Sequence, residues 1–206
     1  MKTNTSPTIH VEGLDLAGKS TVCRLLAALL GAEHRRNSIL ADNPVHAQAD
    51  ALRFRAILED GPLGWLFYGA LLYDLDNYAP PEGPVIQDST IILRSIVFHE
   101  CFGDKALAAK FRALLPRHPR FTKSFVLTAT DEVRLKRLEG RCSRHNESPE
   151  DFLIRKDPDG FHRMESLLVE TAAAYFGAEV IDSSNLEREG GKDEVVNLIL
   201  EKSNVG

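Results

Sequence analysis

The sequence has little of what marks secreted, membrane-spanning or nucleic-acid-binding proteins. Its 206 residues include three cysteines, an odd number that makes no complete disulfide framework and favours a reducing compartment. No apolar run reaches the length of a membrane span, and the polar segment 1–7 has no signal-peptide core. Lysine and arginine total 25 against 30 acidic residues, and a net charge of −5 disfavours broad binding to nucleic acid or to an anionic membrane. We therefore expect a cytoplasmic protein with no nucleic-acid or membrane partner, in which any anion site is local.

Spacings typical of a zinc site are also missing. His99, Cys101, Cys142 and His145 form neither a C-x-x-C nor an H-x-x-x-H pair, so we expect them to be structural. The hydrophobic fraction of 43% and the charged fraction of 27% suit a globular chain with an adequate core. At this length we expect one domain that spans residues 1–206.

The most specific pattern present is a phosphate loop at residues 13–20. These residues read G-L-D-L-A-G-K-S and fill the pattern G-x-x-x-x-G-K-[ST] without a gap. Residues 8–12 predict a strand before the loop, and the apolar recurrence of residues 19–30 predicts a helix after it. In this order the loop amides and the helix N-terminus face phosphate oxygens, while Lys19 adds a positive charge and Ser20 can ligate Mg²⁺. We therefore expect a nucleoside triphosphate to bind at Gly13, Leu16, Ala17, Gly18, Lys19, Ser20 and Thr21.

Strand and helix signals alternate along the rest of the chain. After the first strand and helix, the pattern predicts a weak strand at 36–40, helices at 46–59 and 63–78, and a strand at 85–88. A helical run ends near residue 115, and further strands are expected at 124–128 and 178–182. Strands separated by helices indicate a five-stranded parallel sheet in a three-layer α/β fold. Ligands of such sheets bind beyond the carboxyl ends of the strands, where the phosphate loop and Asp88 would lie.

The loop also resembles that of one kinase family. Residues 12–21 match the pattern E-G-x-D-x-x-G-K-[ST]-T that is typical of thymidylate kinases and their nucleoside-kinase relatives. The resemblance implies the P-loop kinase fold, ATP as phosphoryl donor and Mg²⁺ as cofactor. It also assigns Asp15, an acid inside the loop, to the substrate hydroxyl or to the Mg²⁺ shell. The alternative is a solvated aspartate that stabilises a tight turn.

Asp88 ends an apolar strand at the rim of the predicted site. The resemblance makes it a catalytic base or a water-mediated metal partner; a simple helix cap is the alternative. Thymidylate kinases carry Asp-Arg at this strand end and deoxynucleoside kinases carry Glu-Arg-Ser, whereas Ser89 follows the acid here. Arg94, six residues after Asp88, is the candidate replacement for the missing arginine.

An aromatic helix precedes this strand. In the family that the chain resembles, this helix places an aromatic ring against the acceptor base and usually an arginine against its edge. Phe67 is the best positional match, but Leu71 and Leu72 occupy the region of the arginine. The loss weakens thymidylate as the specific acceptor, and packing alone could explain the aromatic residues.

Arginines follow the strand expected at 124–128. Arg134, Arg137, Arg141 and Arg144 recur at helical spacing and predict one basic face. By resemblance, residues 141–156 form a lid segment in which Arg141 and Arg144 cover the transferred phosphoryl group. The alternative is a solvated helix that pairs with neighbouring glutamates. Ser183 and Asn185 fall in a segment that resembles the loop lying against the adenine.

The combined prediction is an ATP-dependent kinase with a small-molecule acceptor, most plainly a nucleotide or nucleoside. The resemblance is compatible with a homodimer. Two alternatives remain: a kinase of a non-nucleotide small molecule, and a regulatory ATPase that transfers to water. A switch of the GTPase kind is disfavoured, because no N-K-x-D motif is present.

Overall fold

A five-stranded, all-parallel sheet forms the centre of the molecule. The computed structural model describes residues 6–54, 59–145 and 149–203. The strands are β1 (Thr8–Glu12), β2 (Glu33–Arg36), β3 (Val85–Asp88), β4 (Lys123–Thr128) and β5 (Glu179–Asp182). Their order is β2-β3-β1-β4-β5, so β1 lies in the middle with β3 and β4 beside it. This arrangement confirms the predicted α/β fold with a five-stranded parallel sheet.

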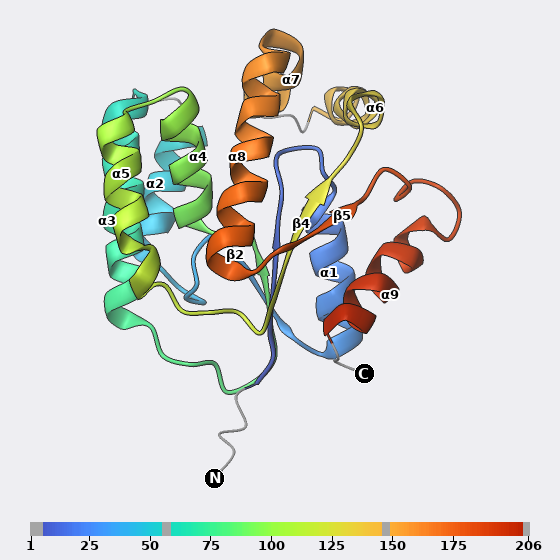
Figure 1. Ribbon diagram of the computed structural model, residues 1–206, viewed down its shortest axis with the longest axis horizontal. Coiled ribbons are helices and arrows are strands. Elements are labelled where there is room, and N and C mark those ends of the chain that lie inside the picture. The colour runs from blue at the N-terminus through green and yellow to red at the C-terminus, as the bar shows by residue number, and fades with distance from the viewer. Residues whose placement is uncertain (1–5, 55–58, 146–148, 204–206) are drawn as a thin grey trace.

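Helices cover both faces of the sheet (Figure 1). One face carries α1 (Lys19–Leu30) and α9 (Gly191–Ser203), and the other carries α2 to α5 and α8. The bounds on that second face are α2 (Pro44–Phe54), α3 (Asp60–Asn77), α4 (Ile91–Cys101), α5 (Lys105–Leu114) and α8 (Pro158–Phe176). Beyond the carboxyl ends of the strands lie α6 (Asp131–Cys142) and α7 (Leu153–Lys156). Two short 3-10 helices adjoin longer ones: η1 (Leu115–Arg117) follows α5, and η2 (Pro149–Phe152) precedes α7.

Two apolar clusters hold the three layers together. Buried residues of α1, α9 and the strands form one cluster, and those of α3, α4, α5 and α8 form the other. The central strand supplies Ile9 and Val11 to the first cluster, and the phosphate loop supplies Leu14 and Leu16 to the second. The loop is therefore anchored in the core at its base.

The second strand is the element that the sequence misplaced. It covers Glu33–Arg36 and not 36–40, because its polar residues make an edge strand with an exposed face. Asn37 has a φ of 60°, which turns the chain out of the sheet. The apolar Ile39 that suggested a strand is buried instead, and its backbone N–H donates to Asp74 on α3.

The helix expected at 46–59 begins at Pro44 and is described as far as Phe54; residues 55–58 lie outside the described parts of the chain. None of the helices in those parts is long and apolar enough to span a membrane.

Candidate active site

A buried carboxylate fixes the start of the phosphate loop. Glu12 is inaccessible to solvent and accepts hydrogen bonds from the backbone N–H of Gly13 (3.1 Å), the Ser89 hydroxyl (2.8 Å) and the N–H of Thr90 (3.0 Å). Glu12 thereby ties the end of β1 to the end of β3. Ser89 stands where the resemblance has an arginine, and its hydroxyl is engaged within the protein rather than aimed at a ligand.

Two glycines shape the loop. Gly13 has a φ of 147°, and a Cβ there would lie 2.5 Å from the carbonyl oxygen of Leu127. Gly18 has a φ of 85° and occupies the N-cap position of α1. A side chain at Gly13 would strain the backbone or push the loop away from β4, and a Cβ at Gly18 would lie 2.3 Å from Leu186, so both glycines are needed for this conformation.

The loop presents donors to an anion at the start of α1. Within the described residues, no hydrogen bond uses the backbone N–H of Gly18, Lys19 or Ser20. The Nζ of Lys19 donates to the carbonyl oxygen of Leu14 at 2.9 Å. Burial and the charge of Arg94 lower the pKa of Lys19. Unused amides at a helix N-terminus beside a lysine fit the oxygens of a phosphate group.

Ser20 and Asp88, the two predicted magnesium ligands, lie side by side. The Ser20 hydroxyl donates to Oδ2 of Asp88 at 2.9 Å. Burial alone would raise the pKa of Asp88, but a hydrogen bond with His34 and the charge of Lys19 lower it. An ionised carboxylate and a hydroxyl are hard oxygen donors, so these residues fit Mg²⁺.

Asp15 and Arg94 meet beside the loop. Arg94 donates to Oδ2 of Asp15 at 2.8 Å and to the carbonyl oxygen of Gly13 at 3.3 Å. Both side chains are about a quarter exposed, at 26% for Asp15 and 25% for Arg94. Burial acts to raise the pKa of Asp15, but the positive charges of Arg94 and Lys19 hold it well below its usual range. The structure thus pairs Asp15 with Arg94 beside the loop, and the role of Asp15 at a substrate hydroxyl or in the Mg²⁺ shell stays a prediction.

Phe67 lies on α3 and contacts a ring of α2. It is partly buried, packs against the second apolar cluster and has its ring centroid 6.0 Å from that of His46 on α2. Its predicted role at an acceptor base stays a prediction.

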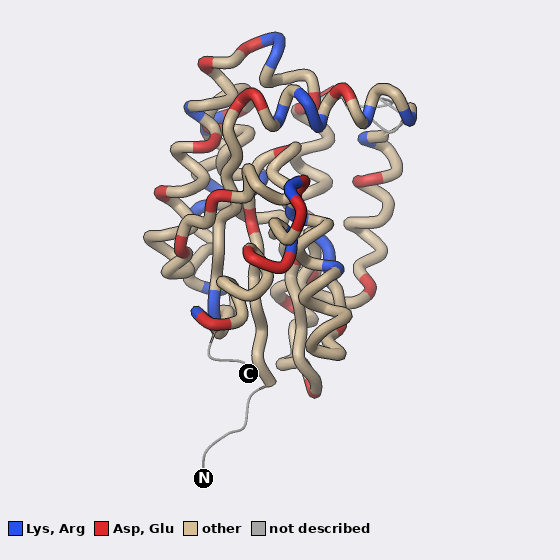
Figure 2. The backbone as a smooth tube through the Cα atoms, turned by 90° about the vertical axis from the view of Figure 1, so that its right-hand side faces the viewer, with Lys and Arg blue, Asp and Glu red and all other residues tan. Residues whose placement is uncertain are grey.

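The first two arginines of α6, Arg134 and Arg137, bind backbone carbonyls of the phosphate loop. Figure 2 shows α6 across the end of the sheet, with basic and acidic residues along its length. Arg134 is fully buried and donates to the carbonyl oxygens of Asp15 (2.8 Å) and Ala129 (2.9 Å), and it pairs with Glu165. Arg137 donates to the carbonyl oxygen of Leu16 at 2.8 Å. These contacts were not predicted, because helical spacing alone does not tell a loop-binding face from a solvated one.

The other two arginines lie nearer the lid segment. Arg141 pairs with the buried carboxylate of Asp151, and Arg144 is exposed. Arg155 lies 3.3 Å from Oε1 of Glu139. Residues 146–148 of the segment lie outside the described residues. The covering roles of Arg141 and Arg144 stay predictions.

The segment after β5 braces the loop from the other side. Ser183 is inaccessible to solvent, and its hydroxyl donates to the carbonyl oxygen of Ala17 at 2.6 Å. Asn185 is exposed two residues later. Ser183 therefore supports the loop backbone in this structure, and contact of either residue with an adenine remains a prediction.

Comparison with known proteins identifies the fold. No family profile and no curated protein matches the chain. Among solved structures, thymidylate kinase from Candida albicans matches with a TM-score of 0.66 at 16% identity, over 97% of this chain and 93% of that one. Thymidylate kinase from Ehrlichia chaffeensis gives 0.62 at 17% identity, over 94% and 98%. Deoxyadenosine kinase from M. mycoides gives 0.60 at 18% identity, over 96% and 98%. The chain therefore has the P-loop kinase fold of thymidylate and deoxyadenosine kinases.

Proposed function

We propose that the protein transfers the γ-phosphoryl group of ATP to a nucleotide or nucleoside. The observation that carries the proposal is the convergence of two segments on the phosphate loop. The end of β3 brings Asp88 to Ser20, and α4 brings Arg94 to Asp15. A site that only binds a nucleotide needs the loop, whereas a site for transfer also needs charged groups for an acceptor beside it.

The residues of the loop would bind and orient the donor. Backbone amides at the start of α1 and the Nζ of Lys19 would hold the phosphate oxygens. Ser20 and Asp88 would hold Mg²⁺, which when bound neutralises charge on the phosphates. Arg141 and Arg144 would exclude water and stabilise charge from the side of α6. Ser183 and Asn185 would lie toward the base of the donor.

Asp15 and Arg94 would face the acceptor. A carboxylate can accept a hydrogen bond from an acceptor hydroxyl, and a guanidinium can grip a phosphate. Two of the structural neighbours are named for thymidylate, a nucleotide, and another for deoxyadenosine, a nucleoside. Both acceptor classes are included in the proposal, because both arginines of the resemblance are missing: either Arg94 replaces one of them and grips an acceptor phosphate, or the acceptor carries no phosphate.

A transfer assay with labelled ATP tests the proposal. The protein is incubated with Mg²⁺ and ATP, first alone and then with separate nucleosides, nucleoside monophosphates and other hydroxylated metabolites. We expect label on at least one nucleoside or nucleotide and little release of phosphate without acceptor. Label found only in free phosphate would favour a regulatory ATPase. Label found only on a non-nucleotide metabolite would favour the other alternative, and either result would overturn the proposal.

A further inference from the structure

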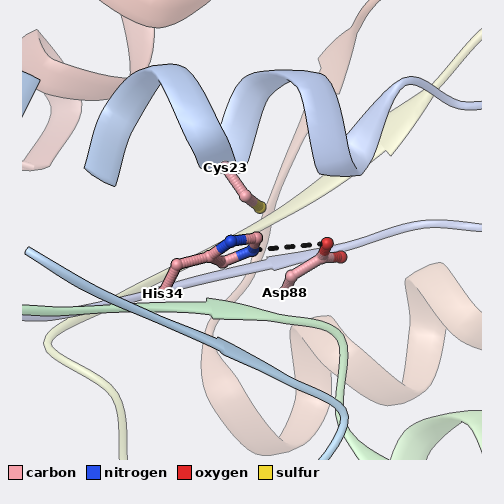
Figure 3. Close-up of side chains that lie close together, drawn as sticks. All are labelled: Cys23, His34 and Asp88. Carbon is pink, nitrogen blue, oxygen red and sulfur yellow. Dashed lines mark ion pairs between the residues drawn. The ribbon is translucent and has the colours of Figure 1, made fainter. Parts of the chain in front are cut away.

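A second group of potential metal ligands lies one helical turn from the phosphate loop. Cys23 on α1, His34 on β2 and Asp88 on β3 each offer one ligand atom, and these atoms all lie within 4.8 Å of one another. Figure 3 shows the Cys23 sulfur and the His34 ring both directed toward the Asp88 carboxylate. The Nε2 of His34 lies 3.6 Å from Oδ2 of Asp88. The cluster joins three separate elements and uses one residue of the candidate active site.

The fold explains why these side chains meet. Parallel pairing of β2 with β3 sets Arg36 beside Asp88, so His34 lies two residues back on the same face of β2. Helix α1 packs over this part of the sheet, and Cys23 follows Ser20 by three residues. Positions three apart share a helix face, so Ser20 and Cys23 both look toward Asp88. The Asp88 carboxylate is therefore close to the Ser20 hydroxyl, the Cys23 thiol and the His34 imidazole.

The donor set differs in kind from that of the proposed magnesium site. Sulfur, nitrogen and oxygen donors together suit zinc and similar transition metals, whereas Mg²⁺ takes oxygen. Zinc binds cysteine sulfur at about 2.3 Å and histidine nitrogen at about 2.0–2.1 Å, which in a tetrahedron puts ligand atoms roughly 3.3–3.8 Å apart. The His34–Asp88 distance of 3.6 Å already falls in that range. The widest separation, at most 4.8 Å, would have to close by about 1 Å.

Access to the cluster comes through His34. Cys23 and Asp88 are buried, but 28% of the His34 side chain is exposed on the edge strand. His34 is not part of the core cluster that contains Cys23. A buried pair of ligands with one exposed partner gives an ion both a dry site and an entry route.

We propose that Cys23, His34 and Asp88 bind one divalent transition-metal ion of the zinc class. The three side chains supply sulfur, nitrogen and oxygen and leave a fourth position for water. Binding displaces the proton of the Cys23 thiol to solvent, since the thiolate is the metal ligand. An ion held here would bind the Asp88 carboxylate, which Ser20 also contacts. Any effect of this ion on the proposed Mg²⁺ site rests on the proposed function, whereas metal binding itself does not.

Cobalt spectroscopy tests the proposal on the full chain. The purified protein is stripped with a chelator and titrated with Co²⁺ alone, then with Zn²⁺. We expect a thiolate-to-cobalt charge-transfer band together with the visible bands of four-coordinate cobalt, and loss of both when zinc is added. Absence of the charge-transfer band in the wild-type protein would overturn the proposal.

Three variants assign the ligands. Cys23→Ser should lose the charge-transfer band, while the matched control Cys101→Ser, on α4, should keep it. His34→Gln changes an exposed edge residue that leaves the core intact, and it should weaken cobalt binding by at least about tenfold. Circular dichroism checks that each variant is folded. A band that persists in folded Cys23→Ser, or unchanged affinity in His34→Gln, would contradict the assignment.

Discussion

Two regions of the molecule each contain a buried charged side chain that fixes a backbone segment, but the two charges are balanced differently. Under the proposed function, we call the phosphate loop and α6 the donor side, and we call α2, residues 37–43 and α3, which carries Phe67, the acceptor side. The comparison is between Arg134 on the donor side and Asp74 on α3 of the acceptor side; both are at most 1% exposed. Each binds backbone from another segment and so fixes its geometry.

The partners of the two residues differ. Arg134 donates to loop carbonyls and pairs with a carboxylate, Glu165. Asp74 accepts hydrogen bonds from the Ser38 hydroxyl, the Ile39 N–H at 3.1 Å and the Asn43 side chain, all of which are uncharged. Arg134 is thus a buried cation paired with a partly buried carboxylate, whereas Asp74 is a buried carboxylate held by hydrogen bonds from uncharged groups.

This difference has an electrostatic consequence. Burial lowers the pKa of Arg134 and raises that of Asp74, in each case against the charged form. A guanidinium has so high an ordinary pKa that Arg134 keeps its charge at moderate pH, whereas a carboxyl group such as Asp74 can gain or lose its proton there. We infer that the charge of Arg134 is constant at moderate pH and that the stability contributed by Asp74 depends on pH.

The largest expected effect is the loss of phosphoryl transfer in Lys19→Ala. The Nζ of Lys19 donates to Leu14 and lies where a bound phosphate would be. Removing this charge should lower the transfer rate by about a hundredfold to a thousandfold or more, with the fold intact. Transfer is measured with the acceptor that the labelled-ATP assay identifies. The matched control is Lys136→Ala, an exposed lysine on α6, and near-normal turnover in folded Lys19→Ala would contradict the kinase proposal.

The next effect concerns stability on the donor side. Arg134→Met keeps much of the side-chain volume but leaves the partly buried Glu165 and two backbone carbonyls without their donor. Breaking a pair whose arginine is fully buried should lower the free energy of unfolding by about 3–5 kcal/mol. Urea unfolding of Arg134→Met and of the exposed control Lys136→Met gives the comparison. Equal stability of the two variants would show that Arg134 does not hold the loop.

The two sides also differ in how far the sequence predicted them. Residues 13–20 form a continuous motif whose backbone geometry follows from its glycines, so the loop and the strand before it could be predicted locally. The role of Arg134, in contrast, depends on a hydrogen bond to the carbonyl oxygen of Asp15, which lies 119 positions away in the sequence. Asp74 likewise binds Ser38, 36 positions earlier in the sequence. Ile39, which was predicted to lie in a strand, instead donates its backbone N–H to Asp74. Such long-range polar contacts leave no periodic signal in the chain.

A smaller effect is expected where the two sides meet, at Arg94. Arg94→Ala removes the partner of Asp15 at 2.8 Å and one cation from the acceptor region. Losing a charge-assisted hydrogen bond costs about 1.5–3 kcal/mol, so the KM for a phosphorylated acceptor should rise by roughly one to two powers of ten. Steady-state kinetics with nucleoside and nucleoside monophosphate acceptors measure the change. The control is Arg112→Ala, whose guanidinium lies 3.7 Å from Glu100. A phosphorylated acceptor whose KM is indifferent to Arg94 would remove Arg94 from the acceptor site.

The smallest effect tests the pH dependence of the acceptor side through Asp74→Asn. A carboxyl group whose folded-state pKa is raised contributes stability that is fully present below its unfolded pKa, about 3.9, and is lost as pH rises through the folded value. The amide variant cannot titrate, and one of its two terminal atoms is a donor that faces donors from Ser38, Ile39 or Asn43. We therefore expect Asp74→Asn to be less stable than the wild type at pH 4, by about 1–3 kcal/mol, and the gap to narrow as pH rises to 7. Urea unfolding across this range measures the gap, with Asp76→Asn as control because Asp76 is exposed and pairs with Arg117 at 2.7 Å. A gap that stays constant or widens with pH would mean that the neutral donors hold the Asp74 charge as well as Glu165 holds that of Arg134, and the contrast between the two sides would fail.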